Sequence, residues 1–239
     1  RYDAQLEWKR RQIDQLLRKM AGLSVSVNPC LGNAEMIYGY RSKITPHFRR
    51  PPDQPETPIG FQKAASRAVV DVPTCPIASR SINAALPGQR ERLRTEPGRY
   101  RKGGTLLMRD SVDGVVTDMK ALARERIGEF GFDFVAGEFF QNNPHVLPIM
   151  VEYALQQAKD PGVDFLVDAY CGVGVFGVCG HRAFQQVAGV EVSERAIELA
   201  RGNARANGAD NVVFHHGAAE ALFAGLEFDP SRTNVLLDP

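Results

Sequence analysis

The sequence has few cysteines, one tryptophan and no long apolar run. Its four cysteines, Cys30, Cys75, Cys171 and Cys179, include no CxxC pair. This scatter argues against a disulfide framework and a structural zinc site, and it favours a reducing, intracellular compartment. No stretch approaches the roughly 20 apolar residues of a membrane helix, and residues 1–12 lack the apolar segment of a secretory signal. We therefore expect no membrane association.

The charged residues are unevenly distributed along the 239 residues. Apolar residues make up 44% and charged residues 24%, which is typical of a globular protein and excludes a disordered or collagen-like chain. Residues 1–135 hold 23 Lys and Arg against 15 Asp and Glu, whereas residues 136–239 hold 6 against 13. Such a division is expected if one part binds a polyanion and the other carries out chemistry. The alternative is two differently charged surfaces with no functional meaning.

The first half predicts a smaller α+β domain, residues 1–135, with antiparallel strands. Residues 2–20 have the spacing of an amphipathic helix packed on another part of the protein, with a basic face that contacts either phosphate or solvent. Alternation over 36–48 predicts a strand with Arg41, Lys43, Thr45 and His47 on one face. The other expected elements are a loop at 51–58, strands at 59–62 and 68–72, a short helix at 76–86 ended by Pro87-Gly88, and a hairpin turning at Asp113-Gly114.

The second half, residues 136–239, predicts an α/β domain with an open parallel sheet. Asn143-Pro144 is a typical helix start, and that helix is expected to reach Lys159. Beyond it, strands at 165–170, 187–192, 211–216 and 233–238 alternate with helical segments, including one at 194–207. Such alternation is typical of a doubly wound sheet. Only about four strands precede Pro239, so we expect a fragment whose sheet is incomplete.

The strongest motif is DAYCGVG, residues 168–174, between a buried strand and a helix. Gly172 and Gly174 allow a tight turn and a close approach to a ligand, and with Gly177 they also fit the GxGxxG pattern of dinucleotide sites. Asp168 places a carboxylate where a pyrophosphate would lie, which suits an ammonium or sulfonium instead. The motif therefore favours S-adenosylmethionine, with a dinucleotide and a purely structural turn as alternatives.

Three further segments lie near the ends of these strands. Glu191 can accept hydrogen bonds from ribose hydroxyls, although it could also be a surface glutamate. The amides of FFQNN, residues 139–143, suit a uracil edge or the methionine part of a cofactor, or the segment is a loop with Asn143 as N-cap. Asp238 could accept from a pyrimidine or an exocyclic amine. The five histidines have no metal-ligand spacing, so we expect no metal site.

Together these residues resemble the RNA 5-methyluridine methyltransferases, most closely the fungal tRNA (uracil-5-)-methyltransferases. The segments that carry the resemblance span most of the chain and keep the family's order: GYRSK (39–43), IGF (59–61), VVDVPTCPIA (69–78), FFQNN (139–143), DAYCGVG (168–174), GVEVSERAIELARGNARANG (189–208) and LLDP (236–239). The resemblance implies a Rossmann-like S-adenosylmethionine-dependent methyltransferase domain. It also implies methylation of uridine C5 in RNA, with the T-loop uridine of tRNA as the expected target.

The resemblance also implies roles for individual residues. Gln141, Tyr170, Glu191 and Asp238 would line the cofactor and uracil pocket. The cysteine nucleophile, which adds to uracil C6, and the glutamate base would lie beyond Pro239, so no catalytic residue is expected in this chain. Relatives often have Asn where Val175 stands. The cysteines lack the clustering of an iron–sulfur site.

The basic half would bind RNA, with Arg41 and Lys43 as the expected contacts or, equally, as structural residues. Three other functions remain open: an amino-group methyltransferase acting on adenine or protein, an NAD-dependent oxidoreductase, and a non-catalytic RNA-binding module. The sequence indicates no obligate protein partner, and it leaves open the compartment among cytosol, nucleus and mitochondrion, the oligomeric state and the modified RNA position.

Overall fold

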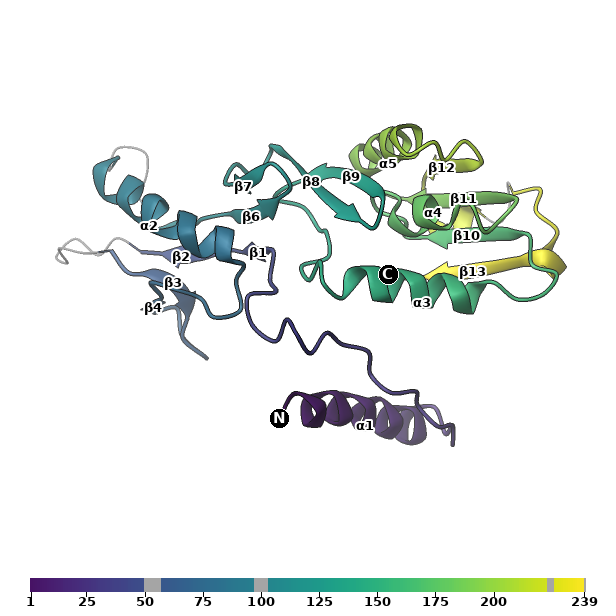
Figure 1. The fold of residues 1–239 in the computed structure, drawn as a ribbon, viewed down its shortest axis with the longest axis horizontal. Helices are drawn as coiled ribbons and strands as arrows, with labels where there is room; N and C mark the ends of the chain where they lie inside the picture. Colours follow the sequence, from purple (N-terminus) through teal and green to yellow (C-terminus); the bar gives the residue numbers. More distant parts are fainter. Residues whose placement is uncertain (50–56, 97–102, 223–225, 239) are drawn as a thin grey trace.

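The computed structural model describes residues 1–49, 57–96, 103–222 and 226–238. Figure 1 shows an elongated molecule with a parallel sheet at one end, small antiparallel sheets at the other, and helix α1 lying apart from both. The expected loop at 51–58 lies largely outside the described residues, as does Pro239.

The parallel sheet is the one expected from the second half of the sequence. Its strands are β10 (Phe165–Ala169), β11 (Gln186–Glu191), β12 (Val212–His216) and β13 (Thr233–Leu237), in the order β12-β11-β10-β13 with every pair parallel. Around it lie α3 (Leu147–Ala158), α4 (Val175–Gly180), α5 (Glu194–Ala206), α6 (Ala219–Leu222) and a 3₁₀ helix at Pro230–Arg232. The strand order reverses at β10, and ligands bind beyond the carboxyl ends of the strands at such a point.

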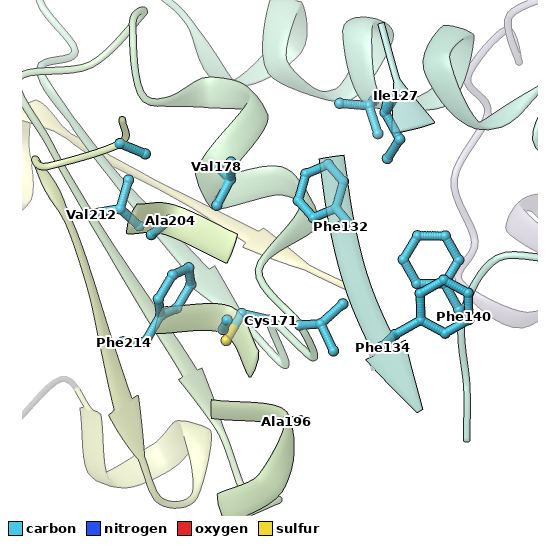
Figure 2. Packing of buried hydrophobic residues seen from close by; sticks show 14 of the residues in the cluster. Ile127, Phe132, Phe134, Phe140, Cys171, Val178, Ala196, Ala204, Val212 and Phe214 are labelled. Carbon is cyan, nitrogen blue, oxygen red and sulfur yellow. The ribbon is translucent and has the colours of Figure 1, made fainter. Parts of the chain in front are cut away.

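A hairpin that the sequence analysis did not predict completes the core of this region. It consists of β8 (Leu122–Ile127) and β9 (Phe130–Val135), whose residues Phe132 and Phe134 are fully buried. Figure 2 shows these rings in one cluster with Val178, Ala204 and Phe214 of the parallel-sheet region. The hairpin thus shares a core with residues that follow it, and the division at residue 135 stays a prediction.

The first half forms two small antiparallel sheets. One has the order β1-β6-β7, from β1 (Lys43–Ile44), β6 (Met108–Ser111) and β7 (Gly114–Val116), and includes the expected hairpin at Asp113-Gly114. The other has the order β4-β3-β2-β5, from β2 (His47–Phe48), β3 (Ile59–Gln62), β4 (Val69–Asp71) and β5 (Gly104–Thr105). The single strand expected at 36–48 is therefore wrong in length. Its alternation is correct, since Ser42, Ile44, Pro46 and Phe48 are buried and residues 43, 45 and 47 between them are not.

Helix α2 (Arg80–Thr95) corrects the helix expected at 76–86. It begins where the Ser79 side chain accepts a hydrogen bond from the amide of Ile82, and it continues through Pro87. The apolar face explains this continuation, because Leu86 and Leu93 on either side of the proline are both buried. Pro87 lies on the exposed face, where water can solvate the carbonyl that loses its helical partner.

Two other helices differ from their expected form. Helix α1 (Tyr2–Met20) exists as expected, and its residues Tyr2 and Leu6 lie against Gly32, but the contact is slight. None of its residues is buried, and Trp8 is 64% exposed. Helix α3 begins at Leu147 rather than at Pro144, because residues 144–146 form a turn. The Asn143 side chain caps that turn by accepting from the amides of His145 and Val146.

Candidate cofactor site

Asp168, near the end of β10, is a buried carboxylate with one unpaired oxygen. Its side chain is 1% exposed; Oδ2 accepts a hydrogen bond from the Gly177 amide at 3.1 Å, and Oδ1 has no partner among the described residues. Burial raises the pKa of Asp168 to about 7, the Gly177 amide opposes this shift, and the negative charges of Asp238 and Glu191 add to it. Asp168 is therefore suited to a cationic ligand, which would restore its ordinary pKa.

The glycine-rich turn after β10 is fixed by its backbone geometry. Gly172 and Gly174 have φ of 53° and 87°, and Tyr170 also lies in the left-handed region at 64°. A Cβ on Gly174 would approach the Phe214 ring to 2.6 Å, so only glycine fits there. Tyr170 keeps this strained backbone conformation while the residue is 41% exposed, and strain of this kind is common at ligand sites.

Glu191, at the end of β11, reaches across to the same turn. Its Oε2 accepts from the Gly172 amide at 3.2 Å, and its Oε1 accepts from the Ser193 amide at 2.9 Å. Ser193 is in turn the N-cap of α5. Each carboxylate oxygen keeps a second acceptor position, so Glu191 is both oriented by the backbone and able to accept from ribose hydroxyls.

Asp238 follows β13, which pairs with β10 so that Leu236 lies opposite Asp168. The Asp238 side chain is exposed, and its charge contributes to the raised pKa of Asp168. The structure therefore brings Asp168, Glu191 and Asp238 to one edge of the sheet. This follows from the topology, because the carboxyl ends of parallel strands lie at the same edge.

Gln141 lies in the loop at 137–143, between the β1-β6-β7 sheet and α3. Phe140 anchors this loop by stacking on Phe134 with ring centroids 4.1 Å apart. Gln141 itself is half-buried, and no hydrogen bond joins it to the three carboxylates in the described part of the chain. The structure therefore fixes the loop, while the role expected for Gln141 stays a prediction.

The two expected RNA contacts, Arg41 and Lys43, are both half-buried. Arg41 Nε donates to the Lys43 carbonyl, and Lys43 Nζ donates to the carbonyls of Gly137 and Glu138 at 2.9 and 3.0 Å. Burial, with the charges of Arg109 and Arg41, lowers the pKa of Lys43. Lys43 thus has a structural role, and RNA binding by either residue stays a prediction.

The cysteines near the glycine-rich turn, Cys171 and Cys179, offer no reactive thiolate. Burial, reinforced by the charges of Asp168 and Glu191, raises the pKa of Cys171 well above its ordinary value, and burial raises that of Cys179 to about 12. Cys75 is also buried. The described residues contain no group of three or more potential metal ligands. In the same residues, no helix is long and apolar enough to span a membrane.

Two residues that support the site were missed by the sequence analysis. Asn203 in α5 is buried, exchanges hydrogen bonds with the backbone of Asp133 in β9 and donates to the Val173 carbonyl in the glycine turn. Arg109 in β6 is 1% exposed and donates to the Asn142 side chain. The sequence could have indicated Asn203, because it places an amide on the apolar face of a helix. Nothing in the sequence distinguishes Arg109 from the other arginines.

Comparison with known proteins shows the family of this chain. Residues 98–229 match the family described as tRNA (Uracil-5-)-methyltransferase. The chain belongs to this family. It is 37% identical over its whole length to a tRNA (uracil(54)-C(5))-methyltransferase of Schizosaccharomyces pombe, and 30% identical to one of Saccharomyces cerevisiae. In both alignments the chain spans 48% of the relative, about half of its length.

A solved structure supports the fold of this family member. The tRNA (uracil-54, C5)-methyltransferase of Pyrococcus abyssi, in complex with S-adenosyl-L-homocysteine, aligns with a TM-score of 0.68 and 23% identity. The alignment covers 91% of this chain and 63% of the other. The Rossmann-like methyltransferase fold, preceded by a region of antiparallel strands, is therefore confirmed.

Proposed function

We propose that residues 136–239 bind S-adenosylmethionine at the edge formed by Asp168, Glu191 and Asp238, and that the basic residues 1–135 bind tRNA. The whole protein would then methylate uridine C5, in the T-loop of tRNA. The unpaired, buried Oδ1 of Asp168 carries the proposal, because such an oxygen needs a donor and a cationic ligand provides one. A pyrophosphate at this position would instead face three negative charges.

The residues present fit the parts of this cofactor. Asp168 would accept from its ammonium group and Glu191 from its ribose hydroxyls, while the exposed ring of Tyr170 would cover its apolar parts. Gln141 would contact the methionine part or the uracil, and Asp238 the pyrimidine edge. When bound, the cofactor supplies an electrophilic methyl group on its sulfonium. The chain's own residues bind and orient that group.

Methylation at C5 also needs a nucleophile that adds to C6 of the uracil, since C5 alone is too weakly nucleophilic. The buried, high-pKa Cys171 and Cys179 do not fit this task, and Cys75 is buried away from the carboxylates in another cluster. We therefore propose that residues 1–239 bind the cofactor without completing a turnover. The nucleophile and the base would be contributed by residues outside this range.

The basic region would supply the energy for exposing the target base. Turning a nucleotide out of its stack costs a few kcal/mol, which phosphate contacts help to offset. The excess of Lys and Arg in residues 1–135 and the names of the fungal relatives support tRNA as the polyanion.

Calorimetric titration of residues 1–239 with S-adenosylhomocysteine and with NADH tests the cofactor. We expect binding of the first and none of the second. Glu191→Ala should weaken binding by about tenfold or more through lost charged hydrogen bonds. Glu194→Ala, an exposed neighbour at the start of α5, is the matched control and should bind as the parent does. Binding of NADH, or of neither compound, would contradict the proposal.

An RNA methylation assay tests the proposed division of labour. Residues 1–239, incubated with S-adenosylmethionine and an unmodified tRNA transcript, should transfer no methyl group. Formation of 5-methyluridine by this chain would show that one of its own residues acts as the nucleophile.

A further inference from the structure

Arg109 is a buried guanidinium at the junction between the β1-β6-β7 sheet and the loop at 137–143. Its Nη1 donates to Asn142 Oδ1 at 3.2 Å, and its Nη2 lies 3.5 Å from the Glu138 carbonyl. Its Nε has no partner among the described residues. Burial lowers the pKa of Arg109 to about 10, so it remains charged at neutral pH.

Neighbouring groups reach the same loop. The Ser42 amide donates to the Asn142 carbonyl at 2.8 Å, and Lys43, paired with Arg109 across β1 and β6, donates to the carbonyls of Gly137 and Glu138. The Arg109 guanidinium also lies 5.1 Å from the centroid of the Phe134 ring, on which Phe140 stacks. The first half of the chain thus contacts residues 137, 138, 140 and 142 of this loop, directly or through Phe134.

The negative charge of Glu125 offsets part of the cost of burying Arg109, but the contacts of Arg109 indicate a further role. Burying a charge is costly, and apolar residues of similar volume often serve a core better. The preceding residue, Met108, is equally buried and belongs to a cluster of buried apolar residues that includes Ile44 and Ile82. Arg109 instead contacts the Asn142 side chain and the Glu138 carbonyl of the loop at 137–143. An apolar side chain could not hold these polar groups in place.

We propose that Arg109 is a positioning residue, which holds the loop at 137–143 so that Gln141 is correctly placed for the cofactor. This inference rests on the proposed function, because it assigns Gln141 to the cofactor site. Arg109 would act only through Asn142 and Glu138, and not by contact with the ligand. It would thereby link the basic half of the chain to the cofactor half.

The first measurement follows the loop itself, without any ligand. Hydrogen exchange of the segment 137–147 is informative, because the amides of Gly137, Glu138, Val146 and Leu147 are hydrogen-bonded. Arg109→Met, which keeps the volume and removes the donors, should accelerate exchange in this segment by about tenfold. Met108→Ala is the matched control in the same strand. It should lower the melting temperature and leave exchange in this segment near that of the parent.

The second measurement is the affinity for S-adenosylhomocysteine. Arg109→Met should weaken it by about tenfold, whereas Met108→Ala should not change it. Asn142→Leu should cause the same loss of affinity. Because Asn142 is only half-buried, this variant tests the proposal even if Arg109→Met does not fold. Asn142→Asp, which still accepts from Arg109, should keep the parent affinity.

The two measurements separate the possible failures. Unchanged exchange in Arg109→Met would overturn the positioning role, whether or not the parent binds the ligand. Faster exchange with unchanged affinity would overturn the link to the cofactor. A parent that binds no S-adenosylhomocysteine would contradict the proposed function, while the exchange data would still report on the loop.

Discussion

The two ends of the molecule place their polar groups in opposite ways. In the parallel sheet, Asp168, Glu191 and Asp238 come from three strands and lie at one edge. In the antiparallel strands of the first half, each turn reverses the direction of the chain, so residues at successive strand ends lie at opposite edges. Basic residues are spread there over short strands and helix α2. Parallel topology thus concentrates a few groups into a site, whereas the antiparallel region provides a distributed positive charge.

The two regions should respond differently to a single added methyl group. Gly174→Ala in the glycine turn would bring a Cβ to 2.6 Å from Phe214 at a positive φ, and should lower the free energy of unfolding by about 3 kcal/mol. Gly88→Ala in helix α2 meets no atom within 4 Å and should raise it by about 0.5–1 kcal/mol. Urea unfolding measures both. Equal effects would mean that the turn is not as constrained as described.

The cofactor end should also show a pH dependence that the basic end lacks. Asp168 has a folded pKa of about 7, above its ordinary value, so the ligand-free protein should lose stability as the pH rises from about 4 to 7. A cationic ligand favours the carboxylate, so affinity for S-adenosylhomocysteine should rise by about tenfold between pH 6 and 8. Calorimetry at several pH values measures this. Asp168→Asn should bind weakly at every pH, and a retained slope in that variant would exclude Asp168 as its origin.

The basic end should respond to salt instead. Replacing both Arg41 and Lys43 by Ala should weaken tRNA binding and flatten its logarithmic salt dependence by at most about two. Because Lys43 Nζ is bound to two carbonyls, we expect Arg41→Ala alone to account for most of the change. Arg124→Ala, in an exposed ion pair with Asp133, is the control for general loss of charge. An unchanged salt dependence in the double variant would show that neither Arg41 nor Lys43 contacts RNA.

The sequence predicted the parallel sheet better than the antiparallel strands for a physical reason. Buried parallel strands such as 165–169 are mostly apolar, and glycines mark the turn that follows, so the strand ends were located correctly. The short strands β1 and β2 carry only two residues each, too few to define a period. The hairpin of β8 and β9 was missed because Arg124, Glu125 and Arg126 interrupt its apolar pattern.

The contacts that support the site could not be predicted from local sequence patterns. A proline ends most helices, but α2 continues past Pro87 because Leu86 and Leu93 lie on one buried face. Whether a helix continues in this way is decided by tertiary packing. Asn203 and Arg109 act on segments 30 or more residues away, on Val173 and Asn142 respectively. Spacing within a sequence carries no information on such pairs.

The backbone conformation of Tyr170 is unfavourable for stability, whereas its side chain has the ligand-binding role that we propose. A side chain in the left-handed region is disfavoured, and Gly or Asn would relieve that strain. Selection for thermal stability alone would therefore favour Gly or Asn at position 170 and would remove the aromatic ring that we propose covers the cofactor. Mutagenesis that aims to stabilise this protein should therefore leave position 170 unchanged.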